Sequence, residues 1–193
     1  VSSYVRCLGL QAKCYDRLVK TFHSSAIKVD LLAVLWAGVV LKLAATLLYR
    51  SNGRIVVVGD GIKVSKEGKK MPAVKLLHEE SQSNSKPPYI MGHFCQALSL
   101  LGACGAYFFA LPIVYRIHEG VVFCNRDKRS VLAKMMLMLE SLNLSAPYYI
   151  VADAHYASGA IVNTLLGDGQ HLITRVRSNA VAYRPAVQPK QRR

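Results

Sequence analysis

The amino-acid sequence predicts an α/β fold in which two helices interrupt the strands of one sheet. Segments rich in β-branched and aromatic residues, as strands are, lie at 55–58, 89–101, 106–115 and 148–152. Residues 171–177 alternate between apolar and polar side chains, which predicts one more strand. Apolar residues are spaced as in helices at 125–142 and 158–166. The predicted order is strand, strand, strand, helix, strand, helix, strand.

Composition restricts the classes of function. The chain has 193 residues, enough for one sizeable domain, and its 52% of hydrophobic residues excludes a disordered protein. Its 25 basic and 11 acidic residues give a net charge of +14, which favours a polyanionic partner such as nucleic acid or an anionic membrane surface. The five cysteines show no CxxC spacing and the chain shows no signal peptide, so we expect free thiols and a cytoplasmic location.

The N-terminal region, residues 1–50, is predicted to be helical. Residues 1–27 space apolar and basic side chains as one or two short amphipathic helices do. Residues 31–49 contain a single charge, Lys42, and approach the length of a membrane span. Because a lysine inside lipid is costly and a soluble α/β pattern follows, we expect a buried helix that shields Trp36 and no membrane partner. A membrane-anchored protein is the alternative.

The first strand runs into a carboxylate. Residues 55–58 are an unbroken β-branched run, and Gly59 and Gly61 then bracket Asp60. Glycine in a strand marks a place where a backbone or a ligand comes close. Since an unpaired buried carboxylate is costly, Asp60 should face a cleft, a base or a cation. A tight turn after the strand, with Gly61 at positive φ, explains the same residues.

The middle of the chain is predicted to form a hairpin and then a helix. Gly102 and Gly105 separate two apolar strands, as in a hairpin. Pro112 suggests that the second of these strands is an edge strand or is irregular. The helix that follows is expected to have its cap at Asn125 or Asp127 and to fill the core with its methionines.

A second carboxylate, Asp153, ends the strand at 148–152. Ser158 can cap the helix that follows. If the strands that end at Asp60 and Asp153 are neighbours, their carboxylates meet. Two repelling carboxylates need a reason to be close, and a divalent metal such as Mg²⁺ is the commonest one. Two such ions can clamp the attacking and leaving oxygens of an in-line displacement.

Four stretches together resemble the catalytic domain of DDE-type insertion-sequence transposases. They are GDGIKV at 59–64, KEGKKMP at 66–72, YIMGHF at 89–94 and YYIVADAHYAS at 148–158. The resemblance covers about residues 28–185. It implies a ribonuclease H-like mixed sheet of order β-β-β-α-β-α-β flanked by helices, in a catalytic domain at 51–182. Asp60 and Asp153 match the family's first and second catalytic aspartates, which hold Mg²⁺ or Mn²⁺.

The resemblance also implies a function. The implied reaction is cleavage of DNA at transposon ends, followed by attack of the freed 3′-hydroxyl on target DNA, and the implied active assembly is a homo-oligomer. The candidate DNA contacts are Lys63, Lys66, Lys69, Lys70, Arg175 and Arg177. A solvated charged loop, to which Lys75 also belongs, is the alternative explanation of the lysines. The alternative function is a non-enzymatic basic nucleic-acid-binding α/β domain, in which the two aspartates are structural.

The family's third acid, usually a glutamate on a later helix, has no match in this sequence. Asp168 lies too near the end of the helix after Asp153 to take that place comfortably. Residues 183–193 read as a basic linker or tail. We therefore expect the third acid beyond Arg193, a fold without the final acidic helix, and a chain that is inactive by itself.

Overall fold

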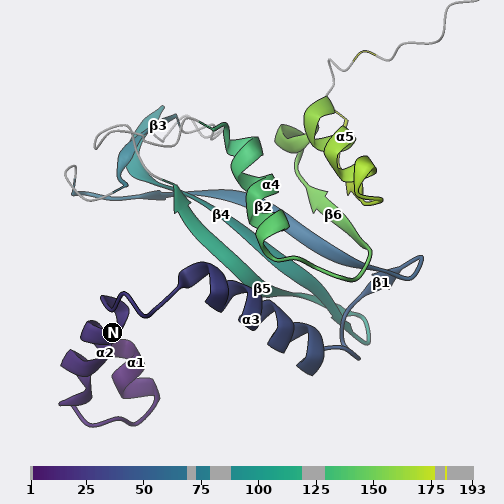
Figure 1. Ribbon diagram of the computed structural model, residues 1–193. Helices are drawn as coiled ribbons and strands as arrows, with labels where there is room; N and C mark the ends of the chain where they lie inside the picture. Colours follow the sequence, from purple (N-terminus) through teal and green to yellow (C-terminus); the bar gives the residue numbers. More distant parts are fainter. Residues whose placement is uncertain (1, 69–72, 79–87, 119–128, 177–180, 182–193) are drawn as a thin grey trace, which may run out of the picture.

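The structure is a computed structural model that describes residues 2–68, 73–78, 88–118, 129–176 and 181 (Figure 1). Its helices are α1 (Ser2–Cys7), α2 (Cys14–Phe22), α3 (Val29–Leu43), α4 (Val131–Ser141), the 3-10 helix η2 (Ala154–Tyr156) and α5 (Gly159–Gly167). Its strands are β1 (Arg50–Ser51), β2 (Arg54–Ser65), β3 (Lys75–His78), β4 (Tyr89–Cys104), β5 (Tyr107–His118), β6 (Tyr148–Ala152) and β7 (His171–Ile173). α1 and α2 are the two short helices predicted near the N-terminus.

The described strands form one mixed sheet of seven strands. Its order is β3-β4-β2-β6-β7, with β1 paired to β2 and β5 paired to β4. β4 is antiparallel to both β2 and β5, whereas β6 is parallel to both β2 and β7. The chain order β2, β4, β5, α4, β6, α5, β7 confirms the predicted ribonuclease H-like fold class. The sequence did not predict β1 and β3.

β2 continues through Asp60, so the alternative of a tight turn at this position is wrong. Asp60 pairs with Ala97 of β4 within the ladder. Gly61 serves close packing and not a turn, because a Cβ at this position would lie 3.0 Å from Cζ of Phe94 and 3.2 Å from Oη of Tyr156.

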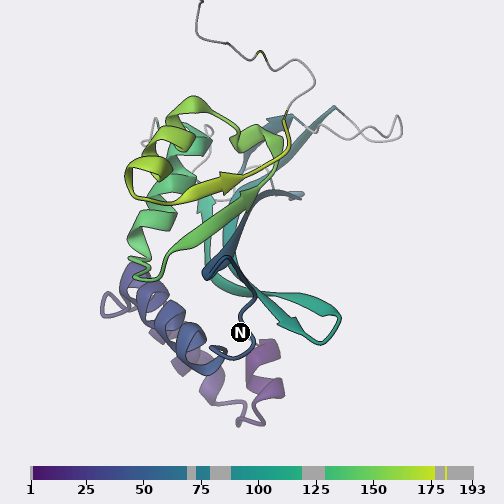
Figure 2. The same ribbon diagram turned by 90° about the vertical axis from the view of Figure 1, so that its right-hand side faces the viewer.

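The core lies between the sheet and three helices that cover one of its faces. α3, α4 and α5 all contribute buried side chains to a single cluster with β2, β4 and β6, and Figure 2 shows the three helices on the same side of the sheet. The largest fully buried apolar side chains are Ile55, Leu98, Leu100, Met135, Leu139, Ile150 and Leu165. Met135 and its neighbours on α4 fill the core, as predicted.

α3 packs on the sheet through its smaller side chains. Ala33, Ala37 and Val40 are buried in the core. Leu41 is partly buried against the core, whereas the other larger apolar side chains of this helix are exposed, namely Val29, Leu31, Leu32, Val34, Leu35, Trp36, Val39 and Leu43. The expectation of a buried helix over 31–49 is therefore wrong, because α3 ends at Leu43 and leaves one apolar face open. No helix in the described ranges is long and apolar enough to cross a membrane.

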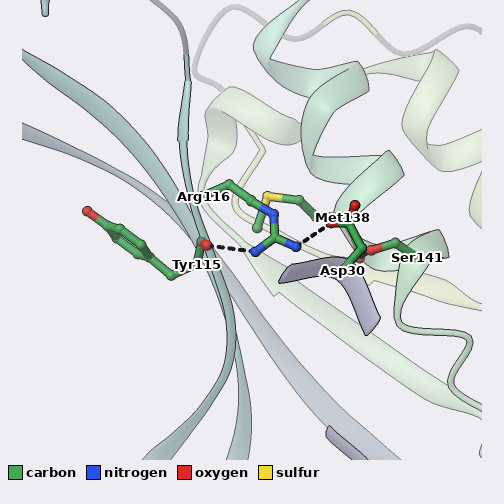
Figure 3. Close-up of polar contacts among 5 residues, drawn as sticks. All are labelled: Asp30, Tyr115, Arg116, Met138 and Ser141. Carbon is green, nitrogen blue, oxygen red and sulfur yellow. Dashed lines mark hydrogen bonds and ion pairs between the residues drawn. The ribbon is translucent and has the colours of Figure 1, made fainter. Parts of the chain in front are cut away.

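Two polar contacts join α3 to β5. Trp36 is 52% exposed, and its Nε1 donates a hydrogen bond of 2.8 Å to the carbonyl oxygen of Pro112. The predicted shielding of Trp36 is therefore wrong. The guanidinium of Arg116 contacts Oδ1 of Asp30 at 2.6 Å and also donates to the carbonyl oxygen of Tyr115 (Figure 3).

The cap of α4 differs from the prediction. The helix begins at Val131, and the hydroxyl of Ser130 accepts a hydrogen bond of 3.1 Å from the N–H of Ala133. The cap is therefore Ser130 and neither Asn125 nor Asp127, both of which lie outside the described residues.

Other turn and boundary predictions are confirmed in part. Gly105 lies in the β4–β5 turn with φ of 58°, and the register of this edge hairpin shifts opposite Pro112, as expected. Ser158 caps α5 by accepting from the N–H of Ile161. β7 ends at Ile173, four residues before the predicted end of that strand.

The four described cysteines are free thiols, while Cys124 and the predicted linker at 183–193 lie outside the described residues.

Candidate active site

Asp60 and Asp153 lie next to each other where β6 ends alongside β2. β2 and β6 pair in parallel as far as Gly59 and Ala152, and each aspartate is the next residue along its strand. Both aspartates line one cavity of about 320 Å³. The remaining walls come from β2, β3, β4, η2 and the first residue of α4. The structure thus brings together the two carboxylates that the sequence singled out.

Each carboxylate is held through one oxygen. The backbone N–H of Gly61 donates to Oδ1 of Asp60 at 2.7 Å, and the N–H of His155 donates to Oδ1 of Asp153 at 2.9 Å. Both aspartates are exposed to solvent. Within the described ranges, Oδ2 of neither residue makes a hydrogen bond or an ion pair. One oxygen of each carboxylate is therefore available to a cation in the cavity.

This donor set fits a hard divalent cation. Mg²⁺ is commonly bound through one or two carboxylates, keeps several waters and also contacts substrate phosphates. Asp60 and Asp153, which both line the cavity, would hold it. Among the residues that the structure describes, no group of three or more His, Cys, Asp or Glu side chains could hold a metal ion.

Two lysines place positive charge beside the carboxylates. Lys63 lines the cavity, and its Nζ donates to the carbonyl oxygen of His78 at 2.7 Å. Lys75 also lines the cavity, and its Nζ lies 5.4 Å from the centroid of the Phe94 ring. Burial and, to a smaller extent, the charge of Lys134 lower the pKa of Lys75 below 10.5. Cations beside carboxylates that could hold a metal ion suit a phosphate-containing substrate.

β3 explains why sequence reasoning treated Lys75 only as one lysine of a basic loop. The strand has four residues, Lys75–His78, and follows a polar basic segment. A pattern of this length is too short for a periodicity argument. Its pairing with β4 over residues 89–92 is what turns Lys75 toward the site.

A buried polar network, which sequence reasoning missed, lies against the cavity. Gln96 is fully buried on β4, and its Nε2 donates to Oη of Tyr156 at 2.8 Å and to the carbonyl oxygen of Val131 at 3.1 Å. Its Oε1 lies 2.6 Å from Nε2 of His118. Because the amide nitrogen already donates twice, Oε1 accepts and the His118 nitrogen donates. The sequence contained one signal of this network, a single amide side chain in an otherwise apolar strand. A polar group that is buried there needs hydrogen-bond partners.

The environment of Tyr156 reflects both its burial and the nearby carboxylates. Burial raises the pKa of the Tyr156 phenol above 10.0. The charges of Asp153 and Asp60 raise this pKa further, whereas the hydrogen bond from Gln96 lowers it. Tyr156 is thus a neutral phenol at the cavity wall, close enough to both aspartates to sense their charge.

The other predicted DNA contacts lie away from the cavity or outside the residues that the structure describes. Lys66 follows the end of β2, Arg175 follows β7, and neither lines the cavity. Lys69, Lys70 and Arg177 lie outside the described residues.

Asp168 lies at the opposite end of β6 from Asp153. It is the C-terminal cap of α5. Burial raises the pKa of Tyr148, the first residue of β6, and the charge of Asp168 adds to this effect. Asp168 therefore neighbours the start of the strand whose other end carries Asp153, and it does not line the cavity of Asp60 and Asp153.

Comparison with protein families gives a match over the C-terminal part of the chain. Residues 116–193 match the DDE superfamily endonuclease model. The DDE resemblance seen in the sequence is confirmed over this segment. The matched residues include β6, Asp153 and α5, while Asp60 precedes them. Comparison with curated protein sequences gives no match.

Three solved structures resemble this chain at low identity. The Mos1 mariner paired end complex with Mn is 11% identical with a TM-score of 0.31, and the match covers 90% of this chain and 53% of that chain. The Mos1 strand transfer complex is 10% identical with a TM-score of 0.28, covering 91% and 53%. The Mos1 transposase paired-end complex with left transposon end is 10% identical with a TM-score of 0.29, covering 87% and 52%. The chain spans about half the length of these proteins.

Proposed function

We propose that this chain carries the catalytic centre for metal-dependent DNA strand cleavage and strand transfer in DNA transposition. The placement of Asp60 within β2 beside Asp153 at the end of β6, with both residues lining one cavity, carries the proposal. The DDE superfamily endonuclease match supports the class of reaction. The net charge of +14 supports DNA as the polyanionic partner.

The side chains of the cavity have distinct roles in the proposed reaction. Asp60 and Asp153 hold Mg²⁺ or Mn²⁺ through their free carboxylate oxygens. When bound, such ions polarise the phosphodiester and lower the pKa of a water nucleophile. Lys63 and Lys75 contact phosphate oxygens and offset the charge that builds up on them.

We infer that a third carboxylate joins the two aspartates during cleavage. Two carboxylates suffice for one ion, because Mg²⁺ keeps several waters. A second ion, placed for in-line displacement, generally needs another oxygen ligand. Since Asp168 lies at the far end of β6 and no described group of three acidic, histidine or cysteine side chains could hold an ion, the third carboxylate comes from outside the described residues, either in the same polypeptide or in another copy within a homo-oligomer.

The same proposal extends the DNA contacts beyond the cavity to Lys66, Lys69, Lys70, Arg175 and Arg177. Contacts between basic side chains and phosphates release counterions, so DNA affinity should fall steeply as salt concentration rises. Fluorescence anisotropy of a labelled duplex at several salt concentrations measures this slope. An affinity that does not change between low and moderate salt would contradict a backbone-binding role for these residues.

Strand cleavage in Mn²⁺ tests the proposed function. The substrates are end-labelled duplexes that cover the DNA on both sides of the coding sequence. The assay compares this chain with the full product of its gene, each as the wild type, Asp60→Asn and Asp153→Asn. We expect the full gene product to make cuts that leave 3′-hydroxyl ends, and we expect both variants to lose this activity. Cleavage that survives either substitution would overturn the proposal, and salt-sensitive DNA binding without cleavage would favour the non-enzymatic alternative.

A further inference from the structure

The buried amide of Gln96 connects the two segments that carry the aspartates. Gln96 pairs with Gly61, the residue after Asp60, in the β2–β4 ladder. Its side chain bonds Tyr156, which lies in the short helix η2 directly after Asp153. One fully buried side chain on β4 thereby fixes η2 against β2 at the cavity.

Tyr156 has a hydroxyl hydrogen that no described residue accepts. The residue is 3% exposed, and its Oη already accepts a hydrogen bond from Gln96. Oη packs against Gly61, since a Cβ built there would lie 3.2 Å from it. A buried hydroxyl normally finds an acceptor for its hydrogen. Because Tyr156 lines the same cavity as Asp60 and Asp153, that acceptor belongs to what occupies the cavity.

We propose that Tyr156, oriented by Gln96, is a positioning residue of the metal site. Its hydroxyl donates a hydrogen bond to an oxygen atom around the ion that Asp60 and Asp153 hold. The inference rests on the proposed function, because it requires that ion. Groups that hydrogen-bond to metal ligands fix the orientation of those ligands, and their loss typically lowers metal affinity by about 10- to 100-fold.

Titration with Mn²⁺ in the absence of DNA tests the inference. Free Mn²⁺ is followed by electron paramagnetic resonance in the wild type and in Tyr156→Phe. We expect the Kd to rise about tenfold in the variant. We expect the unfolding midpoint of the metal-free protein to change little, because Nε2 of the buried Gln96 keeps its hydrogen bond to the carbonyl oxygen of Val131. If Tyr156 had only a structural role, Tyr156→Phe would lower the unfolding midpoint and leave the Kd for Mn²⁺ unchanged.

Tyr148→Phe is the matched control. Tyr148 is also a buried tyrosine whose pKa is raised by burial, but it lies at the other end of β6 and does not line the cavity. We expect this control to bind Mn²⁺ as the wild type does. A loss of affinity in Tyr148→Phe as large as that in Tyr156→Phe would overturn the inference, because metal affinity would then follow stability in general.

Gln96→Leu tests the link between the amide and the phenol. We expect it to lower Mn²⁺ affinity about as much as Tyr156→Phe does, and we expect the double variant to lose no more than the larger single loss, because the two residues act through one contact. Additive losses would overturn the role of Gln96. If Gln96→Leu does not fold, the comparison of Tyr156→Phe with Tyr148→Phe still decides the role of Tyr156.

The outcomes separate this inference from the proposed function. Unchanged Mn²⁺ affinity in Tyr156→Phe, with binding lost in Asp60→Asn, would overturn the role of Tyr156 and leave the two-aspartate site intact. A wild-type chain that binds no Mn²⁺ would overturn both.

Discussion

Asp60 and Asp153 occupy equivalent positions on two neighbouring parallel strands, each one residue beyond the pair Gly59 and Ala152. The carboxyl ends of parallel strands meet at one end of a sheet, where ligands commonly bind. Side-chain direction alternates along a strand, so a shift of one residue in this register would turn one carboxylate to the other face. The register of β2 on β6 is therefore what allows both carboxylates to reach the same cavity.

The β2–β4 ladder leaves no room for a side chain at Gly92. A Cβ at this position would overlap the carbonyl oxygen of Val64, which is part of the backbone and cannot move without disturbing the ladder. We expect Gly92→Ala to lower the free energy of unfolding by about 1–3 kcal/mol in urea denaturation. Gly38→Ala is the control, because open space surrounds Gly38 within α3 and alanine there should raise stability by about 0.5–1 kcal/mol. Equal effects of the two substitutions would contradict the packing of β2 on β4.

The ammonium group of Lys75 is less stable in the folded protein than in the unfolded chain at neutral pH. Burial and Lys134 lower its pKa below 10.5, so the folded protein releases this proton at a lower pH than the unfolded chain does. Between the lowered pKa and 10.5 the unfolded chain binds more protons, and the stability that this group contributes therefore increases with pH. At pH values below that interval Lys75 is protonated in both the folded and the unfolded state, so its buried charge lowers the stability of the fold by the full amount.

Lys75→Met should therefore raise the thermal unfolding midpoint at pH 7 while weakening DNA binding. The substitution removes the half-buried charge and keeps an unbranched apolar side chain next to Phe94. Lys20→Met makes the same change in net charge on the exposed surface of α2 and should leave the midpoint unchanged. Scanning calorimetry and DNA-binding anisotropy measure the two effects. A lower midpoint for Lys75→Met than for the wild type would contradict the role assigned to burial.

Trp36 reports on the open face of α3. It is the single tryptophan of the chain and is 52% exposed. We expect acrylamide to quench its fluorescence in the folded protein, to an extent between that of the urea-unfolded chain and that of a buried indole. Emission at short wavelength with little quenching would show that the large apolar side chains of α3 are covered in solution.

The sequence predicted the strands that carry the site because their signals are local. A buried strand is indicated by the β-branched run before Asp60 and by the apolar run before Asp153. Their convergence follows from strand order, and the family resemblance made that order easier to anticipate. The cap at Ser158 was equally local, since the hydroxyl bonds the backbone three residues later.

The missed features depend on contacts between distant residues. The bond between Gln96 and Tyr156 joins residues 60 positions apart, and neither residue lies in a pattern that predicts the other. α3 was misjudged because hydropathy is high all around this helix, so it could not reveal that Ala33 and Ala37 face the sheet and that Trp36 does not. β3 escaped prediction because four residues carry too little periodicity.

The most direct test of the shared metal site is Mn²⁺ binding by the chain without DNA, measured for the wild type, Asp60→Asn and Asp153→Asn. Asp30→Asn is the matched control, since Asp30 is an exposed aspartate paired with Arg116 and it does not line the cavity of Asp60 and Asp153. We predict that the wild type and Asp30→Asn bind Mn²⁺ with the same affinity and that each of the other two variants loses this binding. Wild-type affinity in either Asp60→Asn or Asp153→Asn would contradict the claim that these two carboxylates hold one ion.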